Sequence, residues 1–116
     1  MATKDLTKAE FDKLSEASGI TLVDFWADWC VPCHRFAPVY ERVSEKHPDV
    51  TFAKVDTMAE EELALELRIT AIPTIMAIRD GVIVFQHAGL LPEAALDNLI
   101  EQVRGLDMDE VRASAA

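Results

Sequence analysis

Short apolar runs alternate with amphipathic segments along most of the chain, and this alternation is the feature that most restricts its fold. Ile20 to Ala27 is apolar and aromatic apart from Thr21 and Asp24, and it is short enough to be a strand covered on both faces. Val50 to Val55 is a second run of this kind. Because a helical segment separates the two runs, we expect parallel strands joined by a crossover.

A hairpin is predicted nearer the end of the chain. Ile72 to Arg79 and Val82 to His87 are strand candidates that flank Asp80-Gly81, a dipeptide typical of a two-residue antiparallel hairpin. Parallel and antiparallel pairs together predict an α/β fold, with a central mixed β-sheet of four or five strands flanked by helices on both faces. The fifth strand would be Ala2 to Leu6, which the charges within it restrict to a short edge strand.

Four segments have helical periodicity and a recognisable start or stop: Thr7 to Gly19, about Cys30 to His47, Thr57 to about Leu67, and Pro92 to Gly105. The first and third begin with the spacing of a capping box, Thr-x-x-Glu. Pro38 lies inside the second segment and predicts a kink, because proline has no N–H for the carbonyl of His34. In the fourth segment, Pro92 is expected at the first helical position.

Length and charge exclude several classes of protein. A chain of 116 residues has room for one domain, and its 11 basic against 21 acidic side chains give a net charge of −10. Nucleic acids and anionic membrane surfaces both require a basic face, so neither is expected as a partner. No apolar run approaches the roughly 18 residues of a membrane span, and Met1 to Glu10 has no apolar segment to serve as a secretory signal. We therefore expect a cytoplasmic protein.

The two cysteines, Cys30 and Cys33, are too few for a disulfide scaffold, so we expect their role to be chemical. Three residues are about one helical turn, which brings the two side chains to the same side and allows a disulfide with little backbone movement. The motif follows a strand and opens a helix, where unpaired N–H groups would stabilise a Cys30 thiolate. Cys33, one turn further in, is expected to be more buried and to attack the mixed disulfide formed by Cys30.

Two alternatives stay open from spacing alone. Cys-x-x-Cys also forms half of many zinc sites, but no second cysteine pair exists, and His34, His47 and His87 lack ligand spacing. An unreactive pair of helical cysteines is the other alternative. We expect no metal and no cofactor beyond a redox-active disulfide between the two cysteines.

A longer segment around the cysteines resembles the active-site region of thioredoxins. The resemblance rests on Val23-Asp24-Phe25-Trp26-Ala27-Asp28-Trp29-Cys30-Val31-Pro32-Cys33, Pro38, Phe52-Ala53-Lys54-Val55-Asp56, Ala71-Ile72-Pro73-Thr74, Asp80-Gly81 and Gly89. It covers roughly Phe11 to Val103. It implies a thioredoxin fold, a dithiol–disulfide cycle and reduction of protein disulfides. We accordingly expect a thioredoxin domain over residues 1–105 and a tail over residues 106–116.

Asp24 and Lys54 are candidates for proton transfer. Asp24 lies in an apolar strand with Leu22 and Trp26 on its side, so desolvation should raise the pKa of its carboxyl. The resemblance implies that Asp24 helps to deprotonate Cys33 through a water and that Lys54 lies near this aspartate. The alternatives are a hydrogen-bonded structural carboxylate and a surface lysine.

The resemblance also implies substrate-binding residues around the sulfurs. A cis peptide bond before Pro73, facing Cys30, would expose the backbone of Ile72 to an extended substrate strand. Trp29 is expected as a partly exposed flat surface for the substrate, whereas Trp26 is expected in the core. Val31, Ala71, Ile72, Ala88 and Gly89 would form a small apolar patch around the sulfurs, and Pro32 is a further candidate for substrate binding. Taken singly, any of these can be a plain core residue.

Three positions depart from the family pattern. Val31 stands where glycine is usual and adds bulk beside the reactive sulfur, His34 replaces a basic residue, and Ala71 occupies a position often held by glycine. A protonated His34 could favour a thiolate, but we expect it to be a solvated helix side chain.

The resemblance favours a thioredoxin that reduces protein disulfides through Cys30 as nucleophile and Cys33 as resolving cysteine. Its expected partners are disulfide-containing proteins and a thioredoxin reductase, and we expect an electron carrier that is a monomer. Val31 keeps open an oxidoreductase dedicated to one partner. A non-catalytic interaction module, in which the patch around Ile72 binds a partner and the sulfurs are dispensable, is the third hypothesis.

Overall fold

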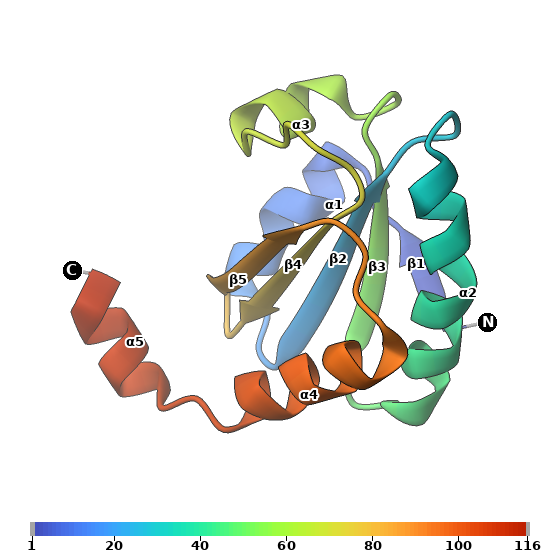
Figure 1. Ribbon diagram of the computed structural model, residues 1–116. Coiled ribbons are helices and arrows are strands. Elements are labelled where there is room, and N and C mark those ends of the chain that lie inside the picture. Colours follow the sequence, from blue (N-terminus) through green and yellow to red (C-terminus); the bar gives the residue numbers. More distant parts are fainter. Residues whose placement is uncertain (1, 116) are drawn as a thin grey trace.

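The computed structural model describes residues 2–115, which form a five-stranded sheet with helices on both faces (Figure 1). The strands are β1 (Thr3–Asp5), β2 (Ile20–Trp26), β3 (Thr51–Asp56), β4 (Thr74–Arg79) and β5 (Val82–Ala88). The helices are α1 (Lys8–Asp12), the 3-10 helix η1 (Lys13–Glu16), α2 (Val31–Lys46), α3 (Glu61–Glu66), α4 (Glu93–Arg104) and α5 (Met108–Ala115). The predicted fold class is confirmed.

The sheet has the order β1-β3-β2-β4-β5. Both β1 and β2 pair with β3 in parallel, whereas β4 is antiparallel to β2 and to β5. The sheet is therefore mixed, as predicted, and Ala2 to Leu6 does contribute an edge strand. Its central strand, β2, ends at Trp26, four residues before Cys30.

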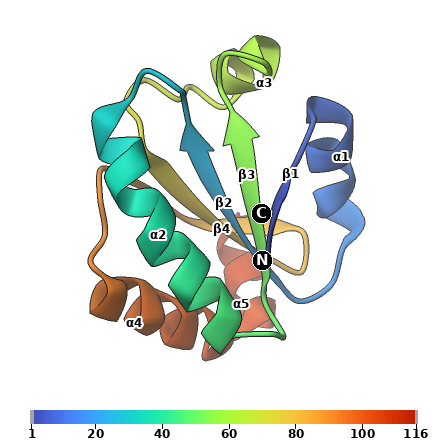
Figure 2. The ribbon, with the colours of Figure 1, turned by 90° about the vertical axis from the view of Figure 1, so that its right-hand side faces the viewer.

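Alternation along the strands builds one apolar core on each face of the sheet. Leu22 and Phe52 pack beneath α2 and α4, with Phe36, Tyr40 and Leu96 among the partners. The neighbouring strand residues pack on the opposite face, against α1 and α3: Val23, Phe25, Ala53 and Val55 with Phe11 and Leu63. Figure 2 shows α2 and α4 on one side of the sheet and α1 on the other.

Two helix starts differ from the predictions. Thr7 does cap α1 in a capping box with Glu10. Thr57, however, does not cap α3, whose N-cap residue is Glu60. The Thr57 hydroxyl instead donates to the Trp26 carbonyl at 3.0 Å, and the backbone N–H groups of the next two residues point to the Asp56 carboxylate. Pro92 is the N-cap residue of α4 rather than its first helical residue.

The predicted hairpin is present, and its turn docks on the chain between η1 and β2. Asp80 and Gly81 both have positive φ, 50° and 81°, as a tight hairpin of this kind requires. The Asp80 N–H donates to the Gly19 carbonyl at 2.9 Å, and the Gly19 N–H donates to Asp80 Oδ1 at 2.8 Å. A Cβ atom on Gly81 would lie 2.2 Å from the Ser15 carbonyl oxygen, so only glycine fits this contact.

The tail after Gly105 forms α5. Asp107 Oδ1 accepts from the backbone N–H groups of Asp109 and Glu110, which begins the helix. Met108 is buried, and Arg112 Nη2 lies 3.4 Å from the Asp80 carbonyl oxygen at the hairpin turn.

Inside α2, the helix continues across Pro38.

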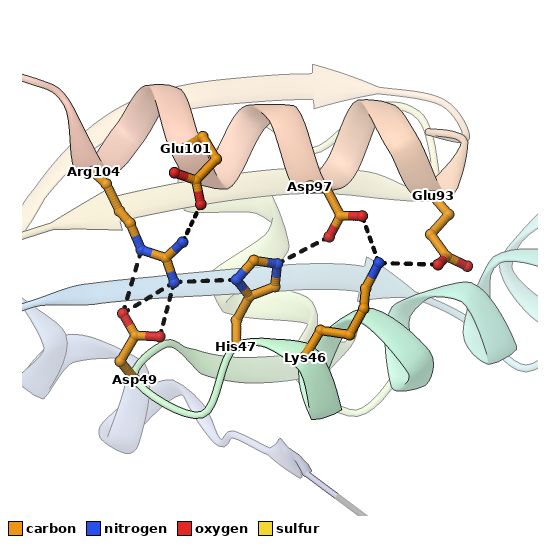
Figure 3. A network of polar contacts seen from close by, with 7 residues as sticks. All are labelled: Lys46, His47, Asp49, Glu93, Asp97, Glu101 and Arg104. Atoms are coloured by element: carbon orange, nitrogen blue, oxygen red, sulfur yellow. Dashed lines mark hydrogen bonds and ion pairs between the residues drawn. The ribbon is translucent and has the colours of Figure 1, made fainter.

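A polar seam of seven side chains joins the end of α2 to α4 (Figure 3): Lys46, His47, Asp49, Glu93, Asp97, Glu101 and Arg104. Lys46 pairs with Glu93 at 3.0 Å and also with Asp97. Arg104 Nη2 donates to Asp49 Oδ1 at 2.8 Å and to His47 Nδ1 at 3.1 Å. An imidazole nitrogen that accepts carries no proton, so Nε2 of His47 carries it and donates to Asp97 Oδ1 at 2.9 Å.

Candidate functional site

Cys30 and Cys33 form a disulfide at the start of α2, with their Cα atoms 5.2 Å apart. Cys30 is the N-cap residue, and its Sγ accepts from the backbone N–H of Cys33 at 3.2 Å. The start of a helix presents N–H groups without helical partners, and here one of them points to the Cys30 sulfur. The predicted geometry of the pair is confirmed.

The burial of the two cysteines is not the predicted one. Cys30 and Cys33 are each 3% exposed, so in the disulfide form neither is more buried than the other. Together with Ala27 they form a small cluster against which Trp26 and Ile72 pack. The disulfide occupies the centre of this cluster, and access to Cys30 depends on the side chains around it.

Trp26 is half-buried against the cysteine cluster and not in either main core, which corrects the prediction. Its ring is covered from one side by Lys54, whose Nζ lies 5.0 Å from the ring centroid. Trp29, by contrast, is 68% exposed, in agreement with its prediction. The two tryptophans therefore flank the disulfide in different environments.

Asp24 is completely buried, and none of the residues 2–115 hydrogen-bonds its carboxylate oxygens. It shares strand parity with Leu22, which lies in the core beneath α2, and with Trp26, which packs on the cysteine cluster. Its side chain is thus on the sheet face that α2 covers. Burial raises the pKa of Asp24 to about 7, and the charge of Lys54, its neighbour across β2 and β3, opposes this rise.

The Ile72–Pro73 peptide bond is cis, as the resemblance implies. The Ile72 carbonyl oxygen lies 3.7 Å from Cys30 Sγ, so this backbone faces the disulfide. Gly89, whose φ is +111°, donates its N–H to the Pro73 carbonyl at 2.8 Å. Gly89 therefore positions the loop that carries Pro73.

An open cavity of about 560 Å³ lies beside Cys30. Its lining contains five residues predicted for the site, Trp29, Cys30, Val31, Pro32 and Ile72, but not Pro73 or Gly89. It also contains Ala71 of the predicted patch and three residues that the sequence did not indicate, Thr57, Ile69 and Thr70. The sequence signal for these three is their position alone: Thr57 follows Asp56, and Ile69 and Thr70 precede Ala71-Ile72-Pro73. The cavity is lined mainly by apolar side chains and can accept part of an apolar partner.

His34 is exposed, as predicted, and its Nε2 lies 2.6 Å from the Asp28 carbonyl oxygen. Its ring also stands edge-on to Trp26, with the centroids 6.5 Å apart. Within residues 2–115, no group of three or more His, Cys, Asp or Glu side chains is arranged to hold a metal ion. The described helices also include none with the length and hydropathy of a membrane span.

Known proteins share both the sequence and the fold. The family model for thioredoxin matches residues 2–102. A Streptomyces coelicolor protein named, provisionally, thioredoxin 2 is 51% identical over 115 residues, which is 99% of this chain and 86% of that relative. The thioredoxin of Alicyclobacillus acidocaldarius is 38% identical, over 88% of this chain and 98% of its own.

A solved structure gives the same result. A mutant thioredoxin from Halobacterium salinarum superposes with a TM-score of 0.82 at 33% identity, covering 90% of this chain and 93% of that one. The sequence match spans most of the chain and includes Cys30 and Cys33, which form a disulfide. The chain belongs to the thioredoxin family of protein disulfide oxidoreductases.

Proposed function

We propose that this protein reduces disulfides in other proteins, with Cys30 as the nucleophile and Cys33 as the resolving cysteine. The observation that carries the proposal is the position of Cys30 as N-cap of α2, with the Cys33 N–H directed at its sulfur. A hydrogen bond to a sulfur anion and a helix start both favour the thiolate, which is the attacking form in disulfide exchange.

The exchange proceeds in two steps. The Cys30 thiolate attacks one sulfur of the target disulfide, so that a mixed disulfide forms and the other target sulfur leaves as a thiolate. Cys33 then attacks the Cys30 sulfur, which forms the Cys30–Cys33 disulfide and releases the second target thiolate. Two electrons pass from the cysteine pair to the target, and the two protons lost by the pair finish on the target thiols. The chain needs no metal or cofactor for this chemistry.

Asp24 is the proton acceptor for Cys33 in this scheme, acting through a water. A base is most effective when its pKa is near the working pH, and burial brings the pKa of Asp24 to about 7. Lys54 keeps that pKa from rising further and is held beside Trp26 by its contact with the ring.

Target proteins bind in the cavity beside Cys30, as an extended segment that pairs with the backbone at Ile72. The carbonyl of Ile72 already faces Cys30 at 3.7 Å, and Pro73 has no N–H to compete for the site. Trp29, Val31 and Pro32 supply apolar contact area. Gly89 acts indirectly, by holding the Pro73 carbonyl.

The wider cellular role is part of the same proposal. The protein is a cytoplasmic electron carrier that works as a monomer and is returned to its dithiol form by a thioredoxin reductase. A net charge of −10 disfavours binding to nucleic acids and anionic membranes.

Trapping of targets tests the roles of the cysteines. Cys33→Ser should accumulate stable mixed disulfides with target proteins, because the second step is blocked, while Cys30→Ser should accumulate none. Both variants are incubated with oxidised target protein and resolved by non-reducing electrophoresis. Equal trapping by the two variants would contradict the assigned roles.

A dedicated oxidoreductase is the second candidate, and the position of Val31 favours it. This side chain is 60% exposed and lines the cavity next to Cys30, where it restricts the approach of bulky targets. A reduction potential well above that of cytosolic reductants, together with activity toward a single target, would favour this candidate. A non-catalytic module instead predicts full biological activity of the double variant Cys30→Ser with Cys33→Ser.

A further inference from the structure

Several of the large apolar side chains that the fold leaves exposed belong to the segments that line the cavity. Among the described residues, six are strongly exposed: Trp29, Val31, Met58, Leu65, Ile83 and Leu90. The first two line the cavity, Met58 follows its lining residue Thr57, and Leu65 lies on α3, which connects Thr57 with Ile69 and Thr70. Exposed apolar side chains that collect in one place indicate a binding surface.

Leu65 has no role in the core of the protein. The buried face of α3 is formed by Leu63 and Ala64, and Leu67 packs against the same core, whereas Leu65 is 72% exposed. In a helix of 3.6 residues per turn, Leu65 lies on the side opposite to Leu63 and Leu67. The Leu65 side chain is therefore available to a partner.

The same surface of α3 carries carboxylates without ion-pair partners. Glu60 accepts from the Lys8 backbone N–H at 2.8 Å and Glu66 lies 3.4 Å from Lys8 Nζ, so both are engaged with α1. Glu61 and Glu62 are exposed and form no ion pair within residues 2–115. Glu61 precedes Leu65 by four residues, which places the two side chains on one face of the helix.

The charge of this segment is strongly one-sided. From Asp56 to Ile72 the sequence contains five carboxylates and one basic residue, Arg68. Asp28, which precedes the lining residue Trp29, is also exposed and forms no ion pair among the described residues. An apolar surface with acidic surroundings is complementary to a partner that is apolar and basic.

We propose that Leu65 and Glu61 extend the substrate site along α3, and that the preferred targets are proteins whose reducible disulfide is followed by a bulky apolar residue and a lysine or arginine. This inference rests on the proposed reduction of protein disulfides. The apolar residue packs on Leu65 at the rim of the cavity, while the basic residue pairs with Glu61. Together they select targets, and the chemistry at Cys30 is unchanged.

The test compares two disulfide peptides that differ only after the second cysteine, one with Leu-Lys and one with Ser-Glu. The small uncharged hydroxyethyl disulfide serves as the reference substrate. We expect kcat/KM to be about 10-fold or more higher for the Leu-Lys peptide, the size of effect that burial of one leucine supports. Leu65→Ser should remove most of this preference, and Glu61→Lys should reduce it about 3-fold, as loss of one surface ion pair predicts.

Two control variants change the same properties elsewhere. Ile83→Ser removes an exposed apolar side chain from β5, and Glu16→Lys changes the net charge by the same amount as Glu61→Lys but in η1. Both should keep the preference of the unmodified protein. The contribution of Glu61 should fade in 1 M salt, where the Debye length is about 3 Å, while that of Leu65 should persist.

The outcomes separate this inference from the proposed function. If hydroxyethyl disulfide and both peptides are not reduced, the proposed function fails. If all three are reduced but the two peptides react equally, or if Leu65→Ser keeps the full preference, the docking role of α3 is overturned. Unchanged reduction of hydroxyethyl disulfide by each variant shows that its fold is intact.

Discussion

Asp24 and the polar seam hold charge under opposite conditions, although both lie against α2. Asp24 is buried without a hydrogen-bond partner among the described residues, and desolvation raises its pKa to about 7. In the polar seam (Figure 3), each carboxylate has a cationic partner. Hydrogen bonds from Lys46 and then His47 lower the pKa of Asp97, and the hydrogen bond from Arg104 lowers the pKa of Asp49.

The two regions differ in how their charges affect the stability of the fold. A buried, unpaired carboxylate destabilises the fold whenever it is ionised, and such a residue is retained where its proton is useful. Exposed ion pairs compete with water and lose side-chain entropy, so each contributes little to stability. The seam therefore joins two helices at small energetic gain, while an ionised Asp24 lowers stability, a cost that the proposed proton transfer would explain.

The largest effect is expected from Asp24→Asn, which should make the oxidised protein more stable at pH 8 by about 4 kcal/mol, since one pKa unit corresponds to about 1.36 kcal/mol. The folded-state pKa is near 7 and the ordinary value is 3.8. Between about pH 4 and pH 7 the unfolded chain has lost this proton while the native protein still holds it, so the contribution of Asp24 to stability falls as pH rises and levels off above about pH 8.

Urea unfolding of both proteins at intervals from pH 4 to pH 9 measures this difference. Subtracting the two curves removes the contribution of the polar-seam carboxylates to the pH dependence. Because the pKa values of Asp49 and Asp97 are lowered, that contribution changes only at acidic pH. Asp28→Asn, on an exposed neighbour, is the matched control and should leave the curve unchanged. A difference between Asp24→Asn and the unmodified protein that does not vary with pH would refute the assignment.

A smaller effect is expected from Lys54→Met. The charge of Lys54 lowers the pKa of Asp24, so its removal should move that pKa further up and shift the pH midpoint of the Cys33 attack in the same direction. Carbon-detected NMR titration of the Asp24 carboxyl measures the first quantity, and single-turnover release from a mixed disulfide measures the second. The control Lys4→Met, on the edge strand β1, should change neither quantity. If the pKa of Asp24 were lower in Lys54→Met than in the unmodified protein, the proposed effect of the Lys54 charge would be excluded.

Arg104→Ala should lower the free energy of unfolding by about 1 kcal/mol at low salt. A side chain that contacts several partners is expected to contribute more to stability than a typical single exposed ion pair does. The variant loses contacts with Asp49, Glu101 and the Nδ1 atom of His47. The loss should shrink in 1 M NaCl, whereas the effect of Asp24→Asn should stay. Denaturant titration at both salt concentrations makes the comparison, and a loss independent of salt would show that packing rather than charge is responsible.

The smallest effect is expected from Lys46→Met, which should not shift the urea midpoint measurably. Its two ion pairs, to Glu93 and Asp97, are exposed to solvent, and its aliphatic stem is retained by methionine. A destabilisation larger than that of Arg104→Ala would show that the seam is organised around Lys46 instead.

Much of the fold could be predicted because local signals and topology agree. The apolar run at β2, the Asp80-Gly81 turn and the capping box at Thr7 each specify structure within a few residues. The start of α3 could not be predicted in this way. Thr57 has the sequence spacing of a cap, but its hydroxyl reaches the Trp26 carbonyl, a residue 31 positions away in the sequence.

In the candidate site, too, the features set by local sequence could be predicted and those set by distant contacts could not. The cysteine pair and the burial of Asp24 follow from helix and strand periodicity, and both are found as predicted. Thr57, Ile69 and Thr70 line the cavity only because two loops meet there, which no short-range pattern encodes. The polar seam likewise depends on how α4 packs beside α2, which gives His47 contacts with Asp97 and Arg104 that its place in the sequence does not indicate.

Both tryptophans of the chain lie on the short segment that ends at Cys30, one against the sulfurs and one in solvent. Disulfides quench indole emission by accepting an electron from the excited ring, whereas thiols do so weakly. The intrinsic fluorescence of this protein should therefore brighten when the pair is reduced, with no dye attached. The molecule carries its own indicator of oxidation state, placed where the electrons are exchanged.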